Sequence, residues 1–359
     1  MLKKIDIYII KKFLGTYFLS ILLIVCVAVV FDFTEKLDNF IKYEASAYDV
    51  VTKYYLRFIP YFANLFSPLF VFISVIFFTS KLAYDSEIIA MISGGVSFRR
   101  LMRPYLIASS LIAIMVFFLG SSLIPNSNKV RFNFEDEYIS SRKKDMGRNI
   151  HMELEPDTYV YVERFSPNNY TGKMFSLEKF EDGKMVSRTT ANSMRYVKKT
   201  NTWKLFTCVT RTFDGEQETI VKNAQIDTTL QLVPDDLMKL TRFYETMTTS
   251  ELNEHIERQK MRGIDNYTEY VVERHRRLAT PFSALILTLI GVSLSSRKVR
   301  GGSSLHIGIG FVLSFSYILF DTVMSSFAVN GNADPLLAAW LPNIIYAGIG
   351  IYLYIKAPK

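Results

Sequence analysis

Residues Phe13 to Phe33 read FLGTYFLSILLIVCVAVVFDF, an apolar run whose one charged residue, Asp32, lies near its end. A hydrocarbon core of about 30 Å needs about 20 helical residues at 1.5 Å per residue, so the run is long enough to cross a membrane. It is longer than the apolar region of a cleaved signal peptide, about 7 to 15 residues, and no small-x-small cleavage site follows it. We therefore expect a retained transmembrane helix.

Five further apolar runs of similar length follow, and a polar stretch separates the third run from the fourth. A soluble protein does not need this pattern six times. The sequence therefore predicts an α-helical membrane protein with six transmembrane helices, three on each side of an inserted domain. The six runs are Phe13 to Phe33, Phe58 to Phe78, Tyr105 to Ile124, Leu278 to Leu294, Ile307 to Phe327 and Leu336 to Ile355.

The polar insertion has the pattern of a β domain. From His151 to about Ile226 apolar and polar residues alternate with period two, and the dipeptides Asp182-Gly183 and Asp214-Gly215 are typical of turns. We expect an antiparallel meander or sandwich. Ser250 could cap a helix that returns the chain to the membrane. The predicted divisions are 1–125 for an amphipathic N-terminal helix and three transmembrane helices, 126–250 for the β domain, 251–277 for the return segment and 278–359 for the last three transmembrane helices.

Lys and Arg near the helix ends predict the orientation, because cytoplasmic loops are enriched in them. They gather at the N-terminus, the second and fourth connections and the C-terminus, whereas the fifth connection, 328–335, has none. We therefore expect both termini in the cytoplasm and the β domain outside it. The net charge of +8 fits such signals together with anionic lipid, and it requires no nucleic acid. The counted residues are Lys3, Lys4, Lys11, Lys12, Lys81, Arg99, Arg100, Arg103, Arg297, Lys298, Arg300, Lys356 and Lys359.

One group of cations departs from this rule, because it precedes the fourth helix on the expected outer side. Residues next to a long translocated domain follow the rule only weakly, which is one explanation. The other is that these cations meet anionic groups at the outer leaflet, as phosphate contacts. The candidate lipid-phosphate contacts are Arg274, Arg276 and Arg277, with Lys129 and Arg131 after the third helix.

Two carboxylates lie within the apolar runs. An ionised group at that depth costs a few kcal/mol, so it usually faces protein or water. Asp321 lies well inside the fifth run and has either a structural hydrogen-bonding role or a part in gating. Asp32 is closer to the end of its run, and we expect it at the outer interface.

Signatures of catalysis are weak in this sequence. Gly301-Gly302 is not followed by a Lys at the spacing of a phosphate-binding loop, so we expect no ATP hydrolysis by this chain alone. The four histidines show no metal-ligand spacing, and Cys26 and Cys208 are placed too differently for a disulfide. An intramembrane enzyme that uses Asp321 or His306 would need a second catalytic group at the same depth, and none is evident.

The second connection contains the most informative segment, KLAYDSEIIAMISGGVS at 81–97. It predicts a short amphipathic helix, with Asp85 and Glu87 near its start and Gly94-Gly95 at its end. The apolar residues within it are Ile88, Ile89 and Met91. Such a helix lies on the membrane or is offered to a partner.

The chain resembles the LptF/LptG permease family, which extracts lipopolysaccharide from the inner membrane of Gram-negative bacteria. The similarity extends over essentially the whole chain, and LptG is the more similar paralogue. It rests on Ile5 to Leu14, Ser86 to Met91 with Ser93-Gly94-Gly95, Pro125 closing the third helix, Glu273 to Arg277 before Pro281, and Asp321.

The resemblance implies a function and a set of partners. The expected protein is a permease subunit of an ABC transporter, in the inner membrane, with a periplasmic jellyroll-like domain. Its expected partners are an LptB-like ATPase dimer, a second LptF/LptG-type permease, an LptC-like periplasmic protein and lipopolysaccharide. ATP and Mg would be bound by the ATPase, so no cofactor is expected in this chain. The segment implied to form the ATPase-coupling helix comprises Tyr84, Asp85, Ser86, Glu87, Ile88 and Met91.

The sequence departs from the family at the outer end of the first helix. Some members carry a basic residue there, whereas this chain has Asp32, with Lys36 and Lys42 further along. A different class of function also stays open, in which the helices anchor a scaffold whose β domain binds an envelope protein without transport.

Overall fold

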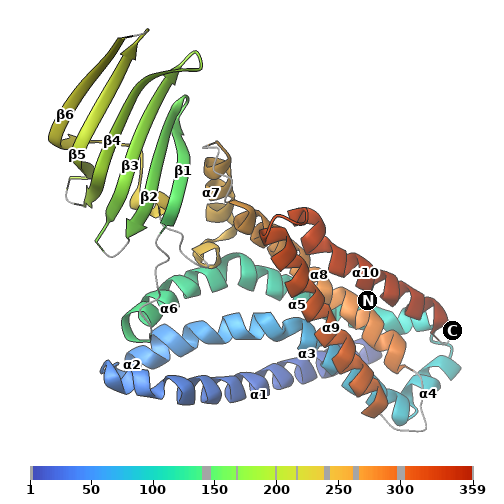
Figure 1. The fold of residues 1–359 in the computed structure, drawn as a ribbon. Helices are drawn as coiled ribbons and strands as arrows, with labels where there is room; N and C mark the ends of the chain where they lie inside the picture. The colour runs from blue at the N-terminus through green and yellow to red at the C-terminus, as the bar shows by residue number, and fades with distance from the viewer. Residues whose placement is uncertain are drawn as a thin grey trace. The chain divides into compact units, whose positions relative to one another are not determined.

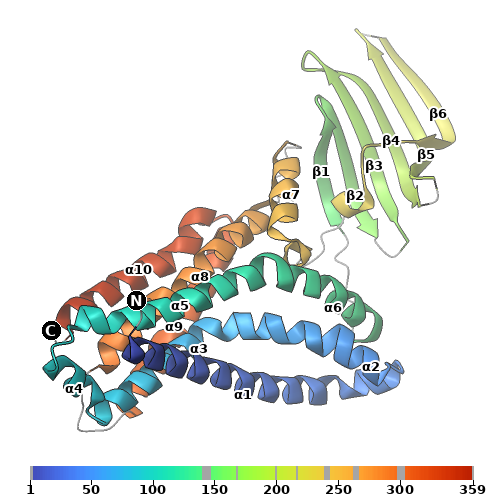
Figure 2. The same ribbon diagram turned by 180° about the vertical axis from the view of Figure 1, so that it is seen from behind.

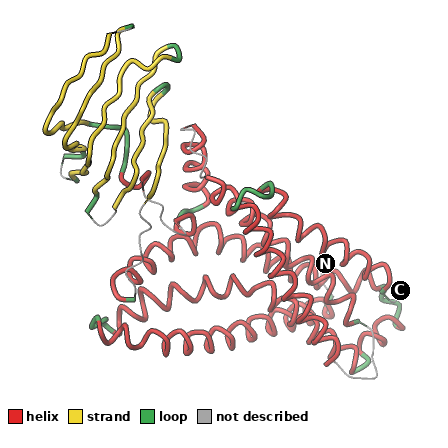
Figure 3. Tube along the Cα trace, viewed as in Figure 1, coloured by secondary structure: helices red, strands yellow, loops and turns green. Residues whose placement is uncertain are grey.

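The computed structural model describes residues 3–139, 147–166, 169–198, 200–215, 217–237, 243–261, 267–296 and 304–357. The chain divides into two compact units. The helical unit comprises Met1–Ile139, Tyr244–Leu252 and Thr268–Lys359, and the second unit comprises Ser140–Phe243 and Asn253–Tyr267. All described strands belong to the second unit (Figure 3). Arg297, Lys298, Arg300 and Lys359, which were counted for orientation, lie outside the described residues, as does the Gly301-Gly302 segment.

The helical unit contains six helices that are long and apolar enough to cross a membrane among the described residues (Figure 1). This confirms the prediction of three helices on each side of an insertion. The spans are Lys4–Lys42, Ala47–Tyr84, Phe98–Tyr138, Thr268–Ser295, Gly308–Val329 and Pro335–Lys356. The elements are α1 (Lys4–Lys42), α2 (Ala47–Asp49), η1 (Val50–Tyr55), α3 (Leu56–Tyr84), α4 (Glu87–Ser93), α5 (Phe98–Phe118), η2 (Leu119–Leu123), α6 (Ile124–Tyr138), α8 (Thr268–Ser295), α9 (Ser304–Val329) and α10 (Pro335–Lys356).

Pro125 does not close the third helix, contrary to the expectation. The helix passes through a π-helical turn, η2, and continues as α6 to Tyr138. Proline has no N–H to donate to the carbonyl oxygen of Ser121, four residues earlier. The hydroxyl of Thr249 donates to that oxygen at 3.3 Å. A wider turn and a side-chain donor thus allow the helix to continue past proline.

The helices differ in how much of each is buried. In the most apolar window of each span, 61% of α8 is buried inside the helical unit, but only 17% of α1 and 17% of α9. Gly310 of α9 lies so close to α3 that an added Cβ would be 2.2 Å from Ile76 Cδ1. The burial fractions show that α8 is central in the helical unit, whereas α1 and α9 present long apolar surfaces to their surroundings. Figure 2 shows α1 and α3 running side by side.

The second unit is built on one antiparallel sheet with the strand order β1-β2-β3-β4-β5-β6. Its buried face packs around Trp203, whose indole N–H donates to the carbonyl oxygen of Leu232 at 2.8 Å. Asp182 and Gly183 both have positive φ, at 49° and 74°, which confirms the tight turn predicted there. The strands are β1 (Gly147–Glu155), β2 (Thr158–Ser166), β3 (Thr171–Glu181), β4 (Lys184–Val197), β5 (Thr202–Asp214) and β6 (Gln217–Thr228).

The inserted antiparallel β domain is thus confirmed. Among the described strands each pairs with its neighbour in sequence, which is a meander rather than the crossed-over strand order of a jellyroll. Two 3-10 turns, η3 (Pro234–Leu237) and η4 (Phe243–Thr246), and the helix α7 (Thr249–Met261) follow the sheet.

The helix after the sheet begins differently from the expectation. Thr248, not Ser250, precedes its first turn, and the amide of Glu251 donates to Thr248 Oγ1 at 3.4 Å. In return the amide of Thr248 donates to Glu251 Oε2 at 2.8 Å. This reciprocal pair is a capping box.

Candidate functional site

The cluster of arginines before the fourth membrane span lies on α8, and its members have different surroundings. Arg277 is 8% exposed. Its guanidinium donates to Glu273 at 2.8 Å and to the carbonyl oxygens of Met247 and Tyr244 at 2.7 and 2.9 Å. Arg277 therefore fixes the segment before α7 to α8, and these contacts occupy its Nε and both terminal nitrogens.

Arg276 forms an ion pair with Asp321 of α9, with 3.5 Å between Nε and Oδ2. The Asp321 side chain is 18% exposed and that of Arg276 is 39% exposed. An aspartate at membrane depth is costly when isolated, and a guanidinium beside it offsets part of this cost. The pair identifies a partner for Asp321 and joins α8 to α9.

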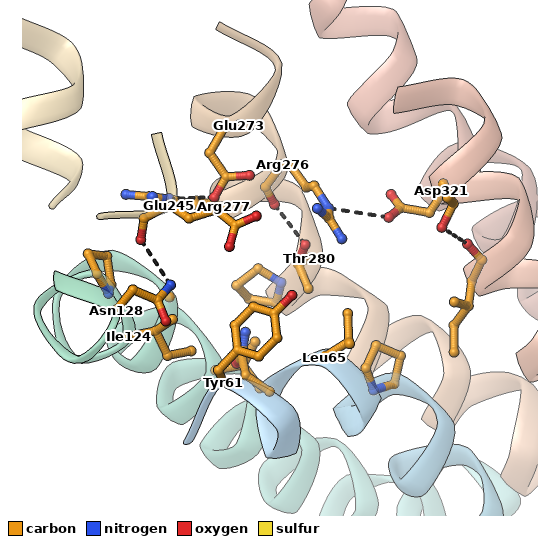
Figure 4. A pocket seen from close by; sticks show the side chains of 18 of the residues that line it. Tyr61, Leu65, Ile124, Asn128, Glu245, Glu273, Arg276, Arg277, Thr280 and Asp321 are labelled. Atoms are coloured by element: carbon orange, nitrogen blue, oxygen red, sulfur yellow. Dashed lines mark hydrogen bonds and ion pairs between the residues drawn. The ribbon is translucent and has the colours of Figure 1, made fainter. Parts of the chain in front are cut away.

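A pocket of about 150 Å³ lies beside this ion pair (Figure 4). Its wall is contributed by α3, the α5–α6 helix, α8 and α9, all from the helical unit. Asn128 donates from Nδ2 to the carbonyl oxygen of Glu245 at 3.0 Å. Its Oδ1 is buried and has no hydrogen-bond partner among the described residues. The polar lining and the volume suit bound water. The polar residues that line the pocket are Tyr61, Asn64, Asn128, Glu245, Glu273, Arg276, Arg277, Thr280, Tyr317, Asp321 and Thr322.

The two cations after the third membrane span are both engaged within the helical unit. Lys129 Nζ lies 2.8 Å from Glu251 Oε1. The hydrogen bond from Lys129, followed by those from Thr248, lowers the pKa of Glu251 below its ordinary value. Arg131 is 3% exposed, and its guanidinium lies 4.7 Å from the centre of the Tyr61 ring. Its Nε is 3.3 Å from Glu135 Oε1. Aromatic faces and one carboxylate thus surround this buried cation.

Arg274 contacts its neighbour His275, with 3.3 Å between Nη2 and Nε2, and it is half-buried. The structure thus brings three of the predicted phosphate contacts together on α8, where Arg276 is the member that lines the pocket and keeps a partly exposed side chain. Lys129 and Arg131 lie on α6 instead, where they form ion pairs with Glu251 and Glu135.

Asp32 is largely enclosed by the chain, since its side chain is 15% exposed. It forms an ion pair with Lys36, and the hydroxyls of Tyr54 and Tyr55 donate to its two oxygens at 3.2 Å each. Lys36 also contacts the Tyr54 hydroxyl and ring. These contacts tie α1 to η1, and they occupy the lysine that follows Asp32.

The predicted coupling segment divides between α3, a two-residue turn and α4. Gly94-Gly95 ends α4 as predicted: Gly95 has φ +84°, and the amide of Val96 donates to Met91 O at 3.0 Å, which is the Schellman arrangement. Ile88 is 1% exposed and belongs to the buried core, against which Met91 packs. Outward-facing positions include Tyr84, which is 63% exposed, and Asp85.

Glu87 and Ser86 are half-buried, and Ile89 is 49% exposed. Ser86 lies in the left-handed region, with φ 63°. The amphipathic pattern groups Ile88, Ile89 and Met91 as apolar positions, and the structure turns Ile88 inward and Ile89 outward. Both a membrane protein core and a partner surface favour isoleucine, so the pattern alone could not separate the two.

Some residues of these sites were not found by sequence reasoning. Asp6 and Arg100 form an ion pair across 94 residues, and no local pattern relates them. Thr248 could have been found, because Thr-x-x-Glu at 248–251 is a capping-box sequence. Tyr54 and Tyr55 carry no local signal for a contact with Asp32.

Six membrane-spanning helices, divided three and three around an inserted antiparallel sheet, define a multi-pass membrane protein with a β domain between its third and fourth spans. The polar pocket and short helix α4 add two distinct sites to this architecture. The chain belongs to the family of the lipopolysaccharide export system permease LptF/LptG, whose family model matches residues 7–356. The matched family includes both LptF and LptG. Among curated proteins, none matches this chain.

Proposed function

We propose that this chain is a permease subunit of an ABC transporter that extracts lipopolysaccharide from the bacterial inner membrane and passes it to a periplasmic bridge. A separate, LptB-like ATPase dimer supplies the energy and binds ATP and Mg. A second LptF/LptG-type permease completes the membrane part, and an LptC-like protein receives the lipid. Of the two permease positions in the transporter, the sequence resemblance favours that of LptG. Both termini are cytoplasmic and the β domain is periplasmic.

The observation that carries the proposal is the placement of α4 within a chain of this family. Helix α4 connects the ends of two membrane spans, α3 and α5, and Ile88 anchors it in their common core. At the same time Tyr84, Asp85 and Ile89 are exposed around it. A short helix that is fixed on one side and exposed on the other is suited to receive a partner and to pass its movement to the membrane spans.

The exposed apolar surfaces of α1 and α9 support the presence of a second permease. Only 17% of the most apolar window of each helix is buried within this chain. Lipid chains and a partner subunit are the two environments that accept such surfaces. At a cavity between two permeases, these apolar surfaces would contact both lipid chains and the partner subunit.

For the lipid's phosphate, Arg276 is the strongest of the five candidate contacts. It lines the pocket, its side chain is 39% exposed, and its ion pair with Asp321 is made through Nε. Arg277, Lys129 and Arg131 already have partners within the chain. A cation with remaining donors can donate to a phosphate oxygen without breaking the fold.

The proposal is tested by purifying the chain from its native membrane in mild detergent and identifying its companions by mass spectrometry. We expect an ATPase with a phosphate-binding loop and a second six-helix permease. Glu87→Arg should remove the ATPase, because it reverses a charge on α4 at the proposed contact. Glu35→Arg makes the same charge reversal at an exposed position of α1 and serves as the matched control.

Two outcomes would count against this assignment. If the wild-type chain is isolated alone, even after crosslinking, the ATPase-driven function is refuted. If an envelope protein that binds the β domain is the only companion, the scaffold function takes its place, and Glu87→Arg should then have no effect.

A further inference from the structure

An ion pair joins the beginnings of two membrane spans that are far apart in sequence. The guanidinium of Arg100, in α5, donates from Nη1 to Asp6 Oδ1 at 2.7 Å and from Nη2 to Oδ2 at 2.6 Å. The Asp6 carboxylate also accepts the amide of Lys3 at 2.7 Å and is 3% exposed. Two parallel charge-assisted hydrogen bonds fix both distance and direction between the groups.

Arg100 lies immediately beyond α4 in the chain. The hydroxyl of Ser97 accepts the amide of Arg100 at 3.3 Å and thereby caps α5, and only the 94–97 linker separates this cap from α4. Ile88 of α4 and Phe98 of α5 belong to the same buried cluster as Ile9 of α1. The beginning of α1, the beginning of α5 and α4 therefore contribute to one buried cluster, in which α4 packs on the end of α3.

Further along, between Tyr17 and Asp32, much of α1 is exposed within this chain. After Tyr17 the buried residues of α1 are Val25 and Phe40 alone among those described. Leu19 and Leu23 between them are 58% and 61% exposed. A helix of 39 residues is about 58 Å long at 1.5 Å per residue. A displacement at its first turns can therefore move a long apolar surface, up to the contacts of Asp32 with η1, that is largely exposed within this chain.

We propose that Asp6 and Arg100 are a positioning pair that transmits movement of α4 into α1. The inference rests on the proposed function, since it requires an ATPase that acts on α4. The buried apolar cluster that includes Ile9, Ile88 and Phe98 keeps these elements together, but apolar surfaces can slide. The bidentate pair resists sliding and rotation, because both hydrogen bonds are lost when either group turns.

The test uses the complete complex of this chain, its ATPase and the second permease, reconstituted in liposomes with lipopolysaccharide. Asp6→Asn and Arg100→Gln are compared with wild type for ATP hydrolysis and for lipid released per ATP. We expect the complex to assemble and hydrolysis to stay within about twofold, while lipid per ATP falls on the order of tenfold. Asp49→Asn is the control, because it breaks the surface ion pair with Lys53 at the other end of the helices.

A covalent link provides a second test that does not depend on the charge. In a Cys26→Ser background, Asp6→Cys with Arg100→Cys should uncouple hydrolysis from release. A short bis-methanethiosulfonate crosslinker should restore lipid per ATP, and reductant should abolish it again. This reversible rescue also applies if Asp6→Asn proves too unstable to purify.

The outcomes separate the inference from the proposed function. If wild type with bound ATPase releases no lipid, the proposed function fails. If wild type releases lipid and both single variants keep its ratio of lipid to ATP, the positioning role fails. Loss of the ATPase from the variants would also overturn it, because the pair would then serve docking rather than transmission.

Discussion

Arg277 illustrates how a residue chosen as a ligand contact can be required by the fold. Its nitrogens donate to Glu273 and to the carbonyl oxygens of Met247 and Tyr244, and its side chain is 6% exposed. Buried carbonyl oxygens that lose their donor destabilise a protein by about 1 to 3 kcal/mol each. These contacts of Arg277 therefore hold the segment before α7 in place.

We expect Arg277→Gln to lower the free energy of unfolding by about 2 kcal/mol. Thermal unfolding in detergent measures this as a lower melting temperature. Arg274→Gln is the matched control, since Arg274 is half-buried and contacts the neighbouring His275 side chain within the described chain. Equal melting temperatures for the two variants would show that the Arg277 contacts do not stabilise the fold.

Glu251 makes the stability of the folded protein depend on pH. The hydrogen bonds from Lys129 and Thr248 lower its pKa in the folded protein below the ordinary value of 4.5. A carboxylate of this kind stabilises the fold above its unfolded pKa, and the contribution is lost as the pH falls through the folded pKa. We expect wild type to melt above Glu251→Gln at pH 6 to 7 and the two to converge at about pH 4 or below.

The expected difference is small, because the Glu251 side chain is 48% exposed and water screens the ion pair. Melting curves of both proteins across this pH range provide the measurement. A difference that persists unchanged to acidic pH would rule out the carboxylate as its source.

At the scale of elements, Gly95 determines where α4 ends. Its φ of +84° is costly for any residue with a Cβ, although no atom within 4 Å would obstruct one. We expect Gly95→Ala to destabilise the end of α4 by about 1 kcal/mol and to weaken retention of the ATPase during purification. Gly15→Ala, at an open position without positive φ, should change neither. Full retention of the ATPase by Gly95→Ala would show that this helix end is dispensable.

The sequence predicted the elements well where one physical requirement dominates. Each membrane span must contain about 20 apolar residues, so all six were found from hydropathy. The alternation of the strands and the Asp182-Gly183 turn likewise follow from local rules. Helix ends were less certain: Pro125 normally disrupts a helix, but a π-helical turn and the Thr249 hydroxyl accommodate it.

The sites could be predicted only in part, because they depend on tertiary contacts. The sequence identified Arg276 and Asp321 as unusual charges but did not pair them. It identified the segment around Glu87 but not which isoleucine turns inward. The partner of Asp6 lies 94 residues away, and the packing of α1 against α5 brings the two together.

At the scale of the whole molecule, the uneven burial of the helices has the most direct functional meaning. Helix α8 forms the centre of the helical unit, whereas α1 and α9 are mostly uncovered. Apolar surfaces that this chain leaves uncovered are available to lipid or to a partner subunit. This arrangement suits a subunit whose α1 and α9 face lipid and a partner while α4 receives the driving force.

The central claim, that this chain moves lipopolysaccharide when a separate ATPase hydrolyses ATP, is tested most directly in liposomes. The complex would be reconstituted with lipopolysaccharide, and transfer to a soluble LptC-like acceptor domain would be followed with ATP, without ATP and with Glu87→Arg. We predict transfer by the wild-type complex when ATP is present. We predict no transfer without ATP and none by the Glu87→Arg complex. Transfer that does not depend on ATP, or no transfer by a complex that hydrolyses ATP, would contradict the account.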